Sequence, residues 1–121
     1  MLHPIKCYCD ASYDPKFRTA VIGWKIGDSN IHTLTIDKTN NIRAEILGFL
    51  DMAKNFHENE KYIVYTDCQN ILNRLHSKEK IIELNFCNKK GHPLSNADLY
   101  QKLFETVTTN IEIVHITGHV R

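Results

Sequence analysis

Residues 61–67 read Lys-Tyr-Ile-Val-Tyr-Thr-Asp, a short and nearly continuous apolar run that ends at an acid. A run of this length and composition is typical of a central strand that is buried on both faces of a sheet. Functional groups gather at the carboxyl ends of such strands in open α/β sheets. Asp67, the first residue after this predicted strand, is therefore a candidate functional residue.

The chain before this run predicts an antiparallel meander. The predicted strands are residues 5–11, 19–27 and 31–37. The first and third alternate apolar and polar side chains, and the second is rich in strand formers. Turn-forming residues at 13–16 and 27–30 separate them, so consecutive strands are expected to run antiparallel.

Helical patterns flank the central run. Over residues 41–56 the apolar positions recur at three and four, which predicts an amphipathic helix capped by Asn40 or Asn41. The later expected elements are a helix over 68–75, a short helix over 80–86 in an otherwise irregular stretch, a helix from the cap Asn96 to about Thr108, and a strand over 111–117.

This order predicts an α/β fold with a five-stranded mixed sheet. The strands at 61–66 and 111–117 follow helical crossovers, so we expect both to run parallel to the first strand. Helices flank the sheet, and residues 1–121 are expected to form one domain, since 121 residues is close to the commonest domain size.

Composition excludes several classes of protein. The chain is 42% hydrophobic and 24% charged, which is ordinary globular usage and argues against disorder. It has no run near the roughly 20 apolar residues of a membrane span and no signal-peptide core, so we expect a soluble, cytoplasmic protein without membrane contact. The net charge of +1 does not point to nucleic acid, and the four cysteines lack zinc-site spacing and are expected to be reduced.

Three acids stand out by position: Asp10 in the first strand, Glu45 near the start of the first long helix, and Asp67 after the central strand. If the two strands are adjacent and parallel, the three carboxylates can meet at one edge. Crowded carboxylates repel one another unless cations hold them, and oxygen ligands favour Mg²⁺ or Mn²⁺. Each acid alone is also explained as a helix cap or a surface group, so spacing leaves the function open.

The same acids lie in segments that resemble motifs of the ribonuclease H family and its wider nuclease superfamily. The segments are Tyr8-Cys9-Asp10-Ala11-Ser12, Thr39-Asn40-Asn41-Ile42-Arg43-Ala44-Glu45, Tyr65-Thr66-Asp67-Cys68-Gln69 and Ile116-Thr117-Gly118-His119. Their order and spacing match the family over nearly the whole chain. The resemblance implies a ribonuclease H-like fold and an endonuclease that hydrolyses the RNA strand of RNA–DNA hybrids. It implies Mg²⁺ as cofactor, for which Mn²⁺ can substitute, and products with 5′-phosphate and 3′-hydroxyl ends.

The resemblance also implies a role for each matching residue. Asp10, Glu45 and Asp67 would be the metal ligands and catalytic carboxylates, and His119 would assist proton transfer or product departure. The implied substrate contacts are Ala11, Ser12, Asn41, Gln69, Lys89 and Lys90. The first four would meet the RNA strand in the minor groove, where 2′-hydroxyl groups distinguish RNA from DNA. The two lysines lie where some members carry a basic protrusion. The positive charge of this region is modest here, so we expect binding of the hybrid to be weak and salt-sensitive.

One family feature is absent from this sequence. The family usually carries a further carboxylate beyond the Gly-His motif, at the start of a final helix, and the sequence stops at Arg121. Asp14 is a poor replacement, because it lies in a predicted turn. With three carboxylates we expect weaker divalent-metal affinity, slower turnover and better activity with Mn²⁺ than with Mg²⁺. We also expect an uncovered apolar patch near the last strand.

Two alternatives remain. The first is a catalytically impaired module of the same fold that binds a hybrid or a protein partner. The second is a relative that cleaves DNA, against which the apparent 2′-hydroxyl readers Asn41 and Gln69 argue. No obligate protein partner is expected.

Overall fold

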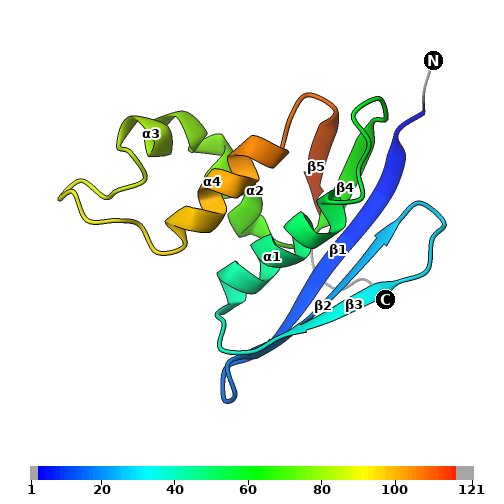
Figure 1. Cartoon of the computed structure of the whole chain (residues 1–121), viewed down its shortest axis with the longest axis horizontal. Helices are drawn as coiled ribbons and strands as arrows, with labels where there is room; N and C mark the ends of the chain where they lie inside the picture. Colours follow the sequence, from blue (N-terminus) through cyan, green and yellow to red (C-terminus); the bar gives the residue numbers. More distant parts are fainter. Residues whose placement is uncertain (1–2, 117–121) are drawn as a thin grey trace.

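A computed structural model describes residues 3–116 and contains strands and helices in the predicted order (Figure 1). The strands are β1 (Ile5–Asp14), β2 (Thr19–Ile26), β3 (His32–Ile36), β4 (Tyr62–Thr66) and β5 (Ile111–His115). The helices are α1 (Asn41–Ala53), α2 (Gln69–His76), α3 (Lys78–Glu83) and α4 (Ala97–Thr106). Within the described range no helix is long and apolar enough to cross a membrane.

The strands form one mixed sheet in the order β3-β2-β1-β4-β5. β1 pairs antiparallel with β2, and β2 pairs antiparallel with β3. β4 runs parallel to both β1 and β5. The predicted meander and the two parallel strands are therefore confirmed, and with them the predicted α/β fold class.

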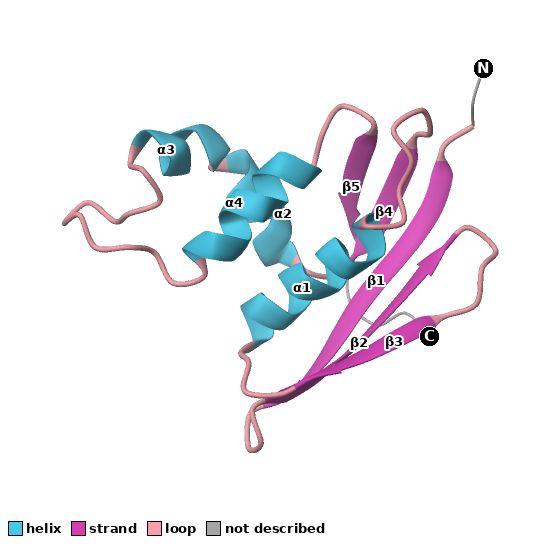
Figure 2. Ribbon diagram, viewed as in Figure 1, coloured by secondary structure: helices cyan, strands magenta, loops and turns pink. Residues whose placement is uncertain are grey.

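The helices pack on one face of this sheet (Figure 2). Every second residue of the inner strands points into that layer, as Cys7 and Cys9 do in β1. The prediction that the central strand is buried on both faces was wrong. Ile63 and Tyr65 of β4 are only half-buried, because the described helices cover the other face of the strand.

Apolar side chains are exposed on the uncovered face. Tyr8 is 46% exposed and stacks on Tyr65 with ring centroids 5.3 Å apart. Val21 of β2 is 47% exposed, and Ile31, the residue before β3, is 69% exposed. Ile116, which follows β5, is 40% exposed.

Helix α1 lies directly against the sheet and contributes buried side chains such as Ile46, Phe49 and Met52. Gly48 faces Ile22 of β2 so closely that an added Cβ would overlap the isoleucine Cγ2 atom. The absence of a side chain at Gly48 therefore sets the distance between α1 and the sheet.

Several element boundaries differ from prediction, among them those of α3, expected at 80–86 and found at Lys78–Glu83, and the ends of β1 and α1. β1 continues to Asp14 instead of ending at residue 11, because its pairing with β2 persists to Asp14↔Thr19. α1 ends at Ala53 instead of residue 56, where the Asn55 side-chain amide lies within 3.4 Å of the Asp51 and Met52 carbonyl oxygens. That contact satisfies carbonyl groups that a longer helix would have bonded.

Candidate active site

Asp10 and Asp67 follow the last paired residues of two neighbouring parallel strands. The register of β1 and β4 ends at Cys9↔Thr66, so the two acids are the next residue on each strand. Asp10 is exposed and its Oδ1 accepts a hydrogen bond from the Ala11 N–H at 2.9 Å. Asp67 is half-buried between β4 and α2. The topology therefore brings these two carboxylates to the same edge of the sheet.

Glu45 reaches this edge from α1, which packs over β1 and β2. It is half-buried, and the Cys68 thiol donates a hydrogen bond to its Oε2 at 2.6 Å. Cys68 immediately follows Asp67, so this bond ties the helix carboxylate to the turn after β4.

Glu45 interacts electrostatically with the two other candidate acids. Burial raises the pKa of Glu45, and the charges of Asp67 and Asp10 raise it further, while hydrogen bonds from Cys68 and Asn70 lower it. The neighbouring Cys9 thiol responds to the same charges. Burial, followed by the charges of Asp10, Glu45 and Asp67, raises the pKa of Cys9 to about 12. The predicted acids thus lie close enough to interact through their charges.

The raised pKa of Glu45 predicts a pH-dependent stability difference for Glu45→Gln. A carboxyl with a pKa higher in the folded than in the unfolded chain binds its proton more tightly when folded. Its contribution is complete below the unfolded pKa and is lost as the pH rises through the folded pKa. In EDTA at neutral pH the variant should therefore be the more stable, with the difference shrinking as the pH falls. Urea unfolding over a pH series measures this, and a constant difference would contradict it.

The start of α1 is fixed by a cap and an ion pair. The Asn40 side chain accepts a hydrogen bond from the Arg43 N–H at 2.8 Å, so Asn40 is the cap and Asn41 is left exposed. The Arg43 guanidinium binds both Asp98 carboxylate oxygens, at 3.0 and 2.8 Å. This pair joins the first turn of α1 to the first turn of α4 and holds the part of α1 that carries Glu45.

Of the remaining predicted site residues, some lie beside the carboxylates and others lie in a distant loop. Ala11 and Ser12 follow Asp10 in β1, and the exposed Gln69 begins α2 after Asp67, so these flank the carboxylates. Lys89 and Lys90 lie in the loop between α3 and α4, which projects away from the sheet (Figure 1). The structure therefore does not bring these lysines to the carboxylate edge.

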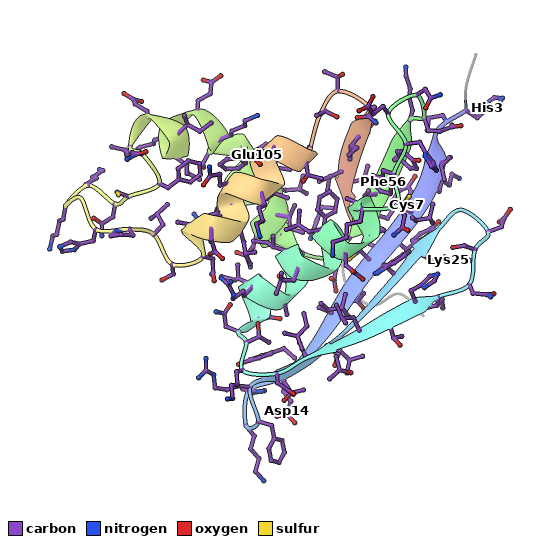
Figure 3. The ribbon with its side chains drawn as sticks, in the orientation of Figure 1. His3, Cys7, Asp14, Lys25, Phe56 and Glu105 are labelled. Atoms are coloured by element: carbon purple, nitrogen blue, oxygen red, sulfur yellow. The ribbon has the colours of Figure 1, made fainter. Side chains whose placement is uncertain are left out.

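His119 and Asp14 are the last two residues that the sequence analysis considered for the site. His119 lies outside the described residues; the last described one, Ile116, donates its N–H to the Thr66 carbonyl oxygen at 2.9 Å. Asp14 is the final residue of β1, not part of the turn, and lies at the hairpin end of the strand (Figure 3). Its Oδ1 accepts the Lys16 N–H at 2.9 Å, so it serves the hairpin.

This arrangement of acids agrees with a comparison to protein families. A family model described as RNase H matches residues 3–121. The chain belongs to the ribonuclease H family. Proteins of this family act on RNA–DNA hybrids as nucleases and generally use divalent metal ions.

A solved structure supports the ribonuclease H-like fold independently. The foamy viral protease-reverse transcriptase, in complex with double-stranded DNA, superposes with a TM-score of 0.78 at 16% sequence identity. The match covers 98% of this chain and 84% of that chain. At this identity the likeness concerns the fold alone. No curated protein sequence matches the chain.

The carboxylates of this ribonuclease H domain suit a hard divalent ion in donor type and charge. Burial, and after it repulsion from Asp67 and Asp10, raises the pKa of Glu45, and a cation would relieve that repulsion. Across residues 3–116, however, no three His, Cys, Asp or Glu side chains stand in an arrangement that could hold a metal ion. The oxygen donors and negative charge of Asp10, Glu45 and Asp67 suit the ion. Their side chains would have to move closer to one another to bind it.

Sequence reasoning missed two residues that hold this site. Cys68 has no predicted role beyond its place in the segment from Tyr65 to Gln69, yet its thiol donates a hydrogen bond to Glu45. Its position directly after Asp67, at the start of a predicted helix, was the available signal. Asp98 was missed because nothing in its local sequence indicates a partner in another helix.

Proposed function

We propose that this ribonuclease H domain hydrolyses the RNA strand of RNA–DNA hybrids in a reaction that depends on a divalent metal ion. The observation that carries the proposal is the placement of Asp10 and Asp67 at the ends of adjacent parallel strands, with Glu45 of α1 bonded to Cys68, the residue after Asp67. Three acidic groups that raise the pKa of a neighbour are costly to the fold unless a cation offsets them. Family membership supports a hybrid as the substrate.

In the proposed reaction water attacks the phosphorus and the bond to the 3′-oxygen breaks, which leaves 3′-hydroxyl and 5′-phosphate ends. Asp10, Glu45 and Asp67 would hold the metal. A bound divalent ion eases deprotonation of water and neutralises charge that develops on the phosphate, and it is proposed to be Mg²⁺ or Mn²⁺. Asn41 and Gln69, exposed at the starts of α1 and α2, would contact the RNA strand beside the carboxylates.

Two proposed contributions are peripheral. Lys89 and Lys90 would bind the phosphate backbone away from the cleavage point, which makes binding salt-dependent. His119 would assist proton transfer or product departure. We propose an intracellular location, where such hybrids form.

The test uses one sequence in three duplex forms: an RNA–DNA hybrid, duplex DNA and duplex RNA, each labelled on both strands. Each is incubated with Mg²⁺, with Mn²⁺ or with EDTA. We expect cleavage of only the RNA strand of the hybrid, faster with Mn²⁺ than with Mg²⁺, and none with EDTA. The 3′ ends of the products should be extended by a polymerase, as 3′-hydroxyl ends are.

The same experiment separates the two alternatives. A binding module is favoured by the lack of a ready metal-holding group within residues 3–116, and it would retain the hybrid in a gel-shift assay without cutting it. Equal cleavage of duplex DNA would instead indicate a DNA-cleaving relative. Either result would contradict the proposed function.

A further inference from the structure

The Cys68 side chain lies at the capping position of α2. Cys68 precedes Gln69, the first residue of α2, and its sulfur interacts with the backbone of Asn70 and Ile71 without closing a capping hydrogen bond. Its sulfur instead lies 2.6 Å from Glu45 Oε2. The thiol therefore links the residue after Asp67 to the helix carboxylate.

The position of this thiol is set by rigid surroundings. Cys68 is 3% exposed, and its backbone N–H donates to Thr66 Oγ1 at 3.1 Å. Thr66 is itself buried at the end of β4. The sulfur is thus held by the core of the sheet, which leaves it few other orientations.

The thiol acts on Glu45 only as a donor. A carboxylate oxygen can only accept, so the hydrogen lies between Sγ and Oε2.

We infer that Cys68 is a positioning residue whose thiol holds Glu45 Oε2 and leaves the other carboxylate oxygen to the divalent ion. The inference rests on the proposed metal dependence of the site. Glu45 has several rotatable bonds, and a fixed donor on one oxygen reduces the number of orientations that the carboxylate samples. Partners that orient a metal ligand in this way typically change metal affinity by about 10- to 100-fold.

The test compares Cys68→Ala, which removes the donor, with Cys68→Ser, which keeps one. A serine hydroxyl donates hydrogen bonds to carboxylates at ordinary O–H···O distances, so it can replace the thiol in this role. Cys7→Ala is the matched control, because Cys7 is a fully buried cysteine of β1 whose thiol donates to the Ile5 backbone carbonyl oxygen at 3.7 Å.

Metal binding is measured directly, without nucleic acid, by titrating each protein with Mn²⁺ and following the free ion by electron paramagnetic resonance. We expect Cys68→Ala to weaken Mn²⁺ binding about tenfold and Cys68→Ser to restore it to within about threefold of the parent. In parallel, the Mg²⁺ concentration that half-activates hybrid cleavage should rise in Cys68→Ala, with a smaller change in the rate at saturating Mg²⁺.

The outcomes separate this inference from the proposed function. Unchanged Mn²⁺ binding in Cys68→Ala would overturn the inference even if the parent cleaves hybrids. Weakened binding in Cys68→Ser equal to that in Cys68→Ala, or in Cys7→Ala as well, would assign the effect to packing and also overturn it. Absence of any Mn²⁺ binding by the parent would overturn it too. If the parent binds Mn²⁺ with the expected pattern but cuts no hybrid, the proposed function fails and the positioning role stands.

Discussion

An Asp10→Asn variant should lose cleavage of the RNA strand by about 10³-fold or more, which corresponds to several kcal/mol of lost transition-state stabilisation. The substitution removes the negative charge that would hold the metal and leaves the size of the side chain unchanged. Single-turnover cleavage at saturating protein measures the loss. The same preparation should still bind the hybrid, because contacts to the RNA strand and the backbone do not depend on this carboxylate.

The fold should tolerate this change. The amide oxygen of asparagine can accept the Ala11 N–H that Asp10 Oδ1 now accepts at 2.9 Å. Removing one charge also reduces the repulsion on Glu45. Asp28→Asn is the matched control, since Asp28 is an exposed aspartate in the turn after β2, and this variant should cleave at the parental rate. Comparable cleavage by both variants would show that the nuclease activity does not come from this site.

The largest effect on stability is expected for Gly48→Ala, which should lower the free energy of unfolding by about 1–3 kcal/mol. In an isolated helix alanine is favoured over glycine by about 1 kcal/mol, so propensity predicts the opposite sign. Packing decides here, because the new Cβ would overlap Ile22 Cγ2 and lie 3.3 Å from Ile22 Cβ. Ile22 is fully buried and has little room to move.

Urea unfolding of both the variant and a control measures this effect. Gly23→Ala is the control, since its Cβ would meet its nearest neighbour, Ile31 Cγ2, only at 3.9 Å. That variant should change stability by no more than about 0.5 kcal/mol. Adding Ile22→Ala to Gly48→Ala should show a favourable coupling between the two sites. A Gly48→Ala variant as stable as the parent would mean that α1 shifts away from β2 at little cost.

The sheet was predictable because its signals are local. Alternation in residues 5–11 and the apolar run at 61–66 identify strands directly, and helical crossovers between strands leave little freedom in their direction. The ends of elements were less predictable. β1 runs to Asp14 because β2 keeps pairing with it, and that long-range pairing leaves no local mark in the sequence.

The candidate site, like the fold, could be predicted from the sequence only in part. Asp10 and Asp67 follow from strand topology, since their strands are adjacent and parallel. The distance of Glu45 from them depends on how closely α1 approaches the sheet, which Gly48 and Ile22 determine. The hydrogen bond from the Cys68 thiol to Glu45 depends on the side-chain rotamer of the buried Cys68. The periodicity of a sequence does not predict side-chain rotamers. Lys89 and Lys90 show the converse: the resemblance counts them among the substrate contacts, yet they lie in the loop between α3 and α4, away from the carboxylates.

Trp24, the sole tryptophan in the sequence, gives this domain an optical reporter of its own. Its indole N–H donates to Asp51 Oδ2 on α1 at 2.8 Å, and its ring stacks on His32 of β3 with centroids 4.4 Å apart. The chromophore therefore touches both the sheet and the helix that carries Glu45. Its emission responds to separation of α1 from the sheet. Fluorescence can therefore distinguish a variant that has lost only cleavage activity from one in which α1 no longer packs on the sheet.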